Sequence, residues 1–270
     1  MSKWVYVVGT IEVETYNRSE KPKKYLKNLI KDAPKITGSE GPVEVFVNIP
    51  SGHNLSVTGD CNACPHGKLK GSDIVCKAKE GTQCTTGYYQ TRALITLYGN
   101  LRDREIKQTE EEYSAFVRFL EEDCGLEIDN VALNISKSWY PYICINKGEI
   151  TMNDLYNVNV TAIIEVDTLI DNSEVDIKEY VENLITPAPK IRGKRFNARY
   201  FVNIPPGHSV LVKDKNGAIT KFFQSHALIT VFGTVEETTE EKVKKEYKEF
   251  LSYLREKCFL KIISEVVSIK

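Results

Sequence analysis

Four cysteines stand close together in the first half of the chain, in the stretch CNACPHGKLKGSDIVCKAKEGTQC. They are Cys61, Cys64, Cys76 and Cys84, with the spacing C-x2-C-x11-C-x7-C, and His66 is a possible substitute ligand. A C-x2-C pair places two thiolates at one turn, where both can bind Zn²⁺ at about 2.3 Å, and two further thiolates complete a tetrahedron. The spacing therefore predicts a structural zinc ion in a Cys-rich insert at residues 54–89.

A metal ion also explains how this insert folds. The stretch is rich in Gly and Lys and has few apolar side chains, so metal binding must supply the free energy that burial cannot. Two disulfides or free thiols are the alternatives. An odd total of seven cysteines and no secretory signal argue against a disulfide scaffold. Four thiolates leave no open coordination position, which argues against catalytic zinc.

A basic loop in the second half of the chain is a candidate nucleic-acid contact. Within KIRGKRFNAR the cations are Lys190, Arg192, Lys194, Arg195 and Arg199, and the insert adds Lys68 and Lys70. Phe196 and Tyr200 stand beside these cations, and this combination suits phosphate contact together with base stacking. The alternative is a solvated loop whose positive charges balance the negative charges on the helix faces. The net charge is −1, so any nucleic-acid contact must come from such a local patch.

Two histidines end the same short phrase, which occurs twice. VNIPSGH ends at His53 and VNIPPGH ends at His208. A strand that ends in a turn, with the imidazole N–H capping the turn, explains the phrase structurally. Near Gln90 and Gln224, at the end of each sheet, His53 and His208 are also weak candidates for a general base in a hydrolase or nuclease. No known catalytic motif accompanies them.

The repeated phrase belongs to an internal duplication. Residues 33–53 and 188–208 are identical at 12 of 21 positions. The match continues in KKYLKNLI and KEYVENLI, and again in QTRALITLYG and QSHALITVFG, where the offset has fallen from 155 to 134. The first repeat therefore carries 21 additional residues, and these hold the cysteines.

Each repeat shows the same order of elements. In the first, we expect strands at 4–15, 43–50, 88–99 and 126–135 and helices at 21–33 and 109–125, the second helix with Thr109 as its cap and Gly125 as its end. The order β-α-β-β-α-β is typical of a ferredoxin-like unit. The fold class is therefore α+β, a tandem duplication of a ferredoxin-like unit, with the insert between strands 2 and 3 of repeat 1.

In such a unit both helices cover one face of the sheet. Alternation assigns Val45, Val47 and Leu97 to the helix side. The opposite face is mixed in character and includes Glu12, Arg92 and Tyr98 in repeat 1 and Glu165, His226 and Phe232 in repeat 2. An exposed face of this kind suits base stacking, whereas two half-apolar faces can instead be buried against each other.

The predicted domains are repeat 1 at 1–137, a packed connector at 138–154, and repeat 2 at 155–270. The start of the chain matches neither a signal peptide nor a membrane span, which predicts a cytoplasmic location without membrane contact. In outline the order resembles that of the RNA-binding repeat proteins of CRISPR complexes. Their glycine-rich loop is absent here, where the equivalent stretches read FLEEDCGLEI and LREKCFLKII.

These features favour a binding protein over an enzyme. We expect a zinc-stabilised protein that contacts RNA or single-stranded nucleic acid through the basic loop and the insert. A protein-binding adaptor or inhibitor that acts through the insert or a sheet face is the first alternative. A small histidine-based hydrolase is the second.

Overall fold

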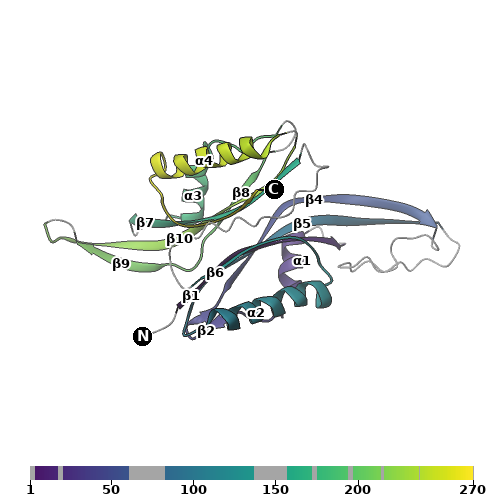
Figure 1. Ribbon diagram of the computed structural model, residues 1–270, viewed down its shortest axis with the longest axis horizontal. Helices are drawn as coiled ribbons and strands as arrows, with labels where there is room; N and C mark the ends of the chain where they lie inside the picture. The colour runs from purple at the N-terminus through teal and green to yellow at the C-terminus, as the bar shows by residue number, and fades with distance from the viewer. Residues whose placement is uncertain are drawn as a thin grey trace. The chain divides into compact units, whose positions relative to one another are not determined.

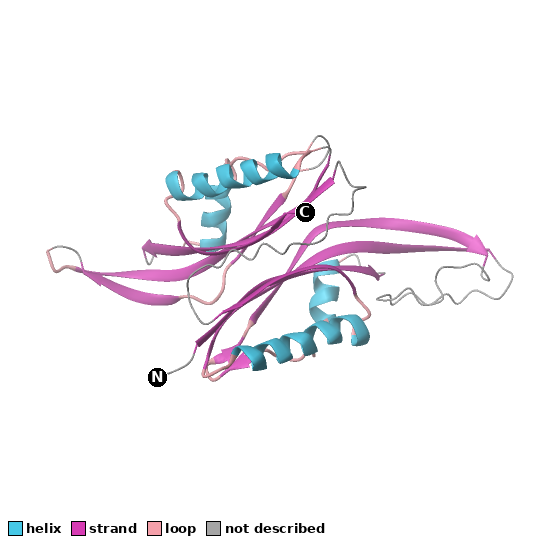
Figure 2. Cartoon of the chain, in the orientation of Figure 1, coloured by secondary structure: helices cyan, strands magenta, loops and turns pink. Residues whose placement is uncertain are grey.

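The computed structural model describes residues 4–17, 21–60, 83–136, 157–171, 175–193, 197–213, 216–236 and 238–269. It is a mixed α+β structure, mostly sheet, with four α-helices in the described ranges (Figure 2). The chain divides into two compact units. Unit 1 comprises Met1–Val131 with Ile135–Lys137, and unit 2 comprises Ala132–Asn134 with Ser138–Lys270.

Unit 1 is an antiparallel sheet with two helices on one face (Figure 1). Its main elements are β1 (Trp4–Asn17), α1 (Pro22–Leu29), β4 (Glu44–Asp60), β5 (Gln83–Arg102), α2 (Ile106–Arg118) and β6 (Glu127–Ser136). A small ribbon of β2 (Thr37–Gly38) and β3 (Gly41–Pro42) precedes β4, and the π-turn η1 (Phe119–Asp123) follows α2. The strand order across the sheet is β4-β5-β1-β6, so β4 is an edge strand.

Unit 2 repeats this arrangement. Its elements are β7 (Asn157–Asp171), α3 (Ile177–Ile185), β8 (Arg199–Asn203), β9 (His208–Lys213), β10 (Ile219–Glu236), α4 (Glu240–Glu256) and β11 (Lys261–Ile269). The strand order is β11-β7-β10-β8, with β9 also paired to β10. Both helices again lie on one face of the sheet, and the edge strand beside the shorter helix is β8 (Figure 1).

The two sheets pair their strands in the same register. Glu12 lies opposite Leu94 in unit 1, and Glu165 lies opposite Leu228 in unit 2. On the other side, Leu94 faces Asn48 just as Leu228 faces Asn203. Because one step of register would turn every side chain to the other face, identical pairing puts matching residues on matching faces.

The helices begin and end for local reasons, and some predicted boundaries are wrong: the first helix was predicted to reach residue 33 but ends at Leu29. Pro22 opens α1, as expected from its fixed φ and missing N–H. We predicted that Thr109 caps the second helix, but α2 begins at Ile106 and Thr109 lies in its first turn, where its hydroxyl donates to the Glu105 carbonyl at 3.0 Å. Beyond α2, Gly125 takes φ 62°, the left-handed conformation that ends helices.

Strand β4 continues through Pro50, where the sequence predicts an end. The pairing with β5 shifts between Asn48 and Ser51, so the proline lies at a bulge, a position at which a missing N–H disrupts no ladder bond. Beyond the bulge the strands form a long hairpin arm whose last pair is Asp60 with Gln83. Unit 2 has a shorter arm, which ends at the pair Lys213 and Ile219. The extra residues of repeat 1 therefore lengthen a hairpin that both units possess.

Each unit has an apolar core between the sheet and its helices. In unit 2 alternate residues of β7 and β10, such as Ile164 and Ile229, pack with Phe250 of α4. Cys124 and Cys258 lie at equivalent places in the two units, both buried, and each thiol donates to a carbonyl at the end of the first helix. Burial raises the pKa of the Cys124 thiol to about 11. These two cysteines are core residues.

Candidate functional site

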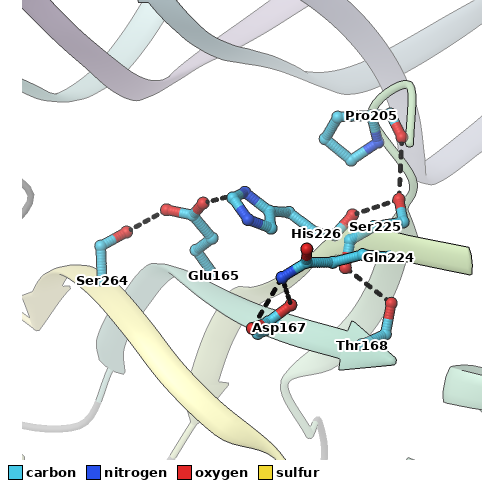
Figure 3. Close-up of polar contacts among 8 residues, drawn as sticks. All are labelled: Glu165, Asp167, Thr168, Pro205, Gln224, Ser225, His226 and Ser264. Atoms are coloured by element: carbon cyan, nitrogen blue, oxygen red, sulfur yellow. Dashed lines mark hydrogen bonds and ion pairs between the residues drawn. The ribbon is translucent and has the colours of Figure 1, made fainter. Parts of the chain in front are cut away.

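A buried polar cluster lies on the face of the unit 2 sheet opposite the helices (Figure 3). Glu165 on β7 is fully buried. Its Oε1 accepts a bond from His226 Nδ1 at 2.7 Å, and its Oε2 accepts one from the Ser264 hydroxyl at 2.7 Å. The bond from Glu165 raises the pKa of His226, because a carboxylate favours the charged imidazolium. The cluster joins the three strands β10, β7 and β11.

A second polar pair, Asp167 with Gln224, continues this cluster along the strands. Asp167 faces His226 across the sheet, and both of its carboxylate oxygens accept from the Gln224 amide, at 3.2 and 3.3 Å (Figure 3). In unit 1 the equivalent amide, Gln90, donates to Glu14 and to the Tyr16 hydroxyl. The paired Gln–acid contact is thus present in both units.

Unit 1 builds the equivalent cluster with arginine in place of histidine. Arg92 forms an ion pair with Glu12, and its Nε lies 3.8 Å from Asp129 on β6. Burial raises the pKa of Glu12 to about 7, an effect larger than the opposing attraction of Arg92. In both units, therefore, a carboxylate and a basic side chain at equivalent positions connect three equivalent strands.

Two roles fit the histidine cluster, a structural tie and a general base, and unit 1 favours the first. A carboxylate on Nδ1 is also the arrangement that orients a general-base imidazole. However, Arg92 cannot act as a base, and the carboxylate and its cation keep the same strand positions in both units. We therefore interpret Glu165 and His226 as a structural tie between strands. The sequence contained the signal, since Glu165 and His226 were assigned to one face, but only the register shows that they are diagonal neighbours.

The duplicated NIPxGH phrase connects β8 to β9 in unit 2, whereas in unit 1 it lies within β4 at the bulge. In unit 2 a Cβ atom on Gly207 would lie 2.7 Å from the Gln224 carbonyl oxygen, so only glycine permits this close approach. The Ser225 hydroxyl donates to the Pro205 carbonyl at 3.1 Å and fixes the turn against β10 (Figure 3). His53 and His208 lie opposite Gln90 and Gln224 in the strand register. The structure does not describe the side chains of these two histidines.

The basic loop begins on a rigid support. The Tyr200 hydroxyl donates to the Pro189 carbonyl at 3.1 Å and accepts from the Ile191 N–H at 3.2 Å. Its ring packs on Phe250, with centroids 4.6 Å apart, and the Lys190 ammonium lies 4.9 Å from its centroid. Burial raises the pKa of Tyr200 to about 12. Tyr200 is thus a structural residue, contrary to our expectation that its ring would stack on bases.

The backbone of the loop is also held from α4, while its arginine faces solvent. Arg192 N–H donates to Glu246 at 2.7 Å, and Lys242 Nζ donates to the Arg192 carbonyl at 3.5 Å. The Arg192 side chain is exposed. Glu246 therefore binds the loop through the backbone N–H of Arg192, and the Arg192 side chain remains exposed.

A hollow of about 720 Å³ lies beside this loop, between α3 and the edge strand β8. We call it the α3/β8 hollow. Its lining includes Lys190, Asn197 and Arg199, with Glu182 as its acidic residue. A concave surface with two cations, next to exposed Arg192, is suited to an anionic ligand that follows the strand edge.

Other sequence predictions fall partly or wholly outside the described residues. Lys194 and Arg195 lie there, as do Lys68 and Lys70, His66 and three of the cysteines, Cys61, Cys64 and Cys76. The backbone of Cys84 is the second residue of β5 and faces Gly59, one pair from the end of the hairpin arm. In the described part of the chain, no three His, Cys, Asp or Glu side chains are grouped as a metal site. The connector at 138–154 also lies outside the described residues.

The sequence left two alternatives for the sheet face opposite the helices, base stacking and burial. Tyr98 and Phe232, the aromatic residues of β5 and β10 on this face, are only 7% and 4% exposed. Burial raises the pKa of Tyr98 far above its usual value. These exposures favour burial over an exposed aromatic platform.

Comparisons with known proteins assign no family. No protein-family model matches the chain, and no curated protein matches its sequence. Among solved structures, the chain is similar to a crystal structure of an unknown protein from Galdieria sulphuraria. That match has 8% identity over 100% of this chain and 98% of the other, and a TM-score of 0.17. No helix in the described ranges is both long and apolar enough to cross a membrane.

Proposed function

We propose that this chain is a cytoplasmic, non-enzymatic protein that binds RNA or single-stranded nucleic acid through the basic edge of unit 2. The observation that carries the proposal is the exposed Arg192 beside the α3/β8 hollow, with Lys190 and Arg199 in the lining of that hollow. Cations at a concave strand edge suit a phosphate backbone. Lys194 and Arg195 stand between them in the sequence, and Lys68 and Lys70 of the insert are proposed to add to the same contact.

The contrast with unit 1 supports this choice. The residues equivalent to Arg192, Lys194 and Arg195 are Thr37, Ser39 and Glu40, so unit 1 has no basic loop at this place. The same β-α-β-β-α-β order forms there without these cations. The fold therefore does not require the cations, and this supports a ligand over the alternative of a solvated loop.

The test is the salt dependence of binding to a single-stranded RNA. Replacing Arg192 with Thr, and Lys194 and Arg195 with Ser, removes three cations. We expect weaker binding to every sequence and a salt slope lower by about two to three, since each phosphate contact contributes about 0.7 to 0.9. The matched control replaces three exposed lysines of α4, Lys244, Lys245 and Lys248, with Gln and should leave the slope almost unchanged.

If the wild-type chain shows no salt-dependent binding to RNA or single-stranded DNA, the proposal is wrong. A protein partner would then be the next candidate, and co-purification from the native cell, scored for protein and for nucleic acid, would identify it. An equal loss of slope in the α4 control would show that overall charge, and not this edge, is responsible.

We also propose that both units are copies of a ferredoxin-like unit. The support is the shared strand order, in which the fourth strand lies beside the first and the second lies at the opposite edge. The identical register at Glu12 and Glu165 adds to it. The insert then extends the tip of one hairpin, between Asp60 and Gln83.

At this tip we propose a structural zinc ion held by Cys61, Cys64, Cys76 and Cys84, with His66 as a substitute ligand. The support is the ligand spacing and the paired hairpin end: Cys61 directly follows Asp60, and Cys84 directly follows its partner Gln83. We expect about one zinc per chain by metal analysis of freshly reduced protein. Replacing Cys61 and Cys64 with Ser should abolish it, while replacing Cys124 and Cys258 should not. Protein prepared under reducing conditions that contains no zinc would refute the proposal.

A further inference from the structure

Unit 1 has its own hollow at the place that corresponds to the α3/β8 hollow of unit 2. It lies between α1 and the edge strand β4, has a volume of about 340 Å³, and is called here the α1/β4 hollow. Its floor is apolar and includes Val47, Leu97 and Phe116, all less than 4% exposed. Val45, at 37% exposure, is a large apolar side chain open to solvent on its wall.

Three lysines complete this hollow. Lys27 lies in the last turn of α1, and Lys31 and Lys35 follow the helix. No carboxylate belongs to the lining, and none of the three lysines forms an ion pair within the described ranges. Apart from the lysines, every lining residue is apolar. An apolar floor with a purely cationic rim is complementary to a ligand with an apolar tail and an anionic head.

We propose that the α1/β4 hollow binds the alkyl chain of a fatty acid, with its carboxylate held by Lys27, Lys31 and Lys35. Each methylene that leaves water for the floor favours binding, and the volume falls in the range of small-ligand sites. The lysine stems add apolar wall while their ammonium groups stay at the rim. A cationic amphiphile of equal length gains the same burial but is repelled by the rim.

Unit 2 gives an internal control for this assignment. At the positions of Lys27 and Lys31 it has Glu182 and Thr186, which line the α3/β8 hollow. That hollow is larger, and its lining includes a carboxylate and more polar residues than the lining of the α1/β4 hollow. The two hollows thus occupy the same place in the fold but suit different ligands. The fatty-acid site is therefore independent of the nucleic-acid proposal.

The test uses the full chain and dodecanoate below its micelle concentration, with binding measured by calorimetry and by methyl NMR shifts of Val45 and Val47. We expect saturable one-site binding, at least tenfold weaker binding of octanoate, and no comparable binding of dodecyltrimethylammonium. Replacing Lys27 with Glu and Lys31 with Thr, the unit 2 residues, should weaken dodecanoate binding at least tenfold. The matched control, Lys24→Glu with Lys23→Thr, makes the same charge change on α1 outside the hollow and should have little effect.

Several outcomes would overturn the proposal. Equal binding of the cationic amphiphile, or equal loss in both double variants, would mean that the lysine rim does not select the ligand. Shifts spread over the chain without saturation would indicate detergent-like adsorption only. If dodecanoate fails to bind while an acidic, valine-rich extended peptide binds and shifts the same methyl groups, the hollow is a peptide groove beside β4. Circular dichroism of each variant shows whether it is folded and so separates these outcomes from misfolding.

Discussion

The two units place the same carboxylate at the same point of the sheet but pair it with different cations. Glu12 is paired with Arg92, and Glu165 is paired with His226 and Ser264. Arginine stays charged at every accessible pH, whereas imidazole is charged only below its pKa. Both units therefore have a tie between equivalent strands, but its chemistry differs, and the two ties must respond differently to pH.

The largest expected effect tests whether the second helices pack alike. Phe250 of α4 and Phe116 of α2 are equivalent and buried, so replacing either with Ala should lower the free energy of unfolding by about 3 to 5 kcal/mol. Phe250 also supports the Tyr200 ring, whereas unit 1 has Val45 at that place. We therefore expect Phe250→Ala to cost more than Phe116→Ala in urea unfolding. A reversed order would show that Tyr200 does not add to this packing.

The next prediction concerns the different pH ranges in which the two ties lose stability as the pH rises. The pKa of Glu12 is about 7 in the folded chain against 4.5 for an ordinary glutamate, so the folded state retains this proton longer. Stability then falls as the pH rises from about 4.5 to 7, by at most about 3 kcal/mol, at about 1.4 kcal/mol per pKa unit. Glu12→Gln, neutral throughout, should flatten this fall, as measured by urea unfolding between pH 4 and 8.

Glu165→Gln should flatten the profile in a higher pH range. The pKa of His226 is raised in the folded state, so its contribution to stability is complete below the unfolded value near 6.5 and is lost as the pH rises through the folded value. Removing the carboxylate should therefore cost most at low pH, about 2 to 3 kcal/mol at pH 6, and less at pH 9. His226→Arg, which imitates unit 1, keeps the cation charged at every pH and should remove the loss of stability that sets in above about pH 6.5. The comparison is wrong if the two Gln variants flatten the same pH range.

The sequence predicts the order of elements well because that order rests on local signals. Pro22, the alternating strands and the internal match all report on short segments, and the structure confirms the elements that they predict. The continuation of β4 through Pro50 was missed because a bulge depends on the partner strand, β5. The contact of Glu165 with His226 depends on register in the same way, since 61 residues separate the two in the chain.

The hollows show a further limit of sequence patterns. Lys27, Lys31 and Lys35 look like the solvated side of an amphipathic helix, which is the common role of such lysines. That they surround an apolar floor follows only from the position of α1 against β4 and from the side chains of Leu97 and Phe116 beneath it. The basic loop was found from sequence because its charge differs from that of its own copy in repeat 1.

The smallest expected effect concerns the end of the second helix in each unit. Gly125 and Phe259 are equivalent and both adopt positive φ, 62° and 55°. This conformation crowds the Cβ atom of an L-residue against the backbone and costs about 1 kcal/mol, a cost that glycine escapes. Phe259 is 85% exposed, so its ring contributes little packing in return. Phe259→Gly should therefore raise the free energy of unfolding by about 1 kcal/mol, and Gly125→Ala should lower it by a similar amount, both measured by urea unfolding.

Phe259→Ala keeps the Cβ atom and removes only the ring, so it should leave stability nearly unchanged. If Phe259→Ala stabilises the chain as much as Phe259→Gly, the cost lies in the exposed ring and not in the backbone.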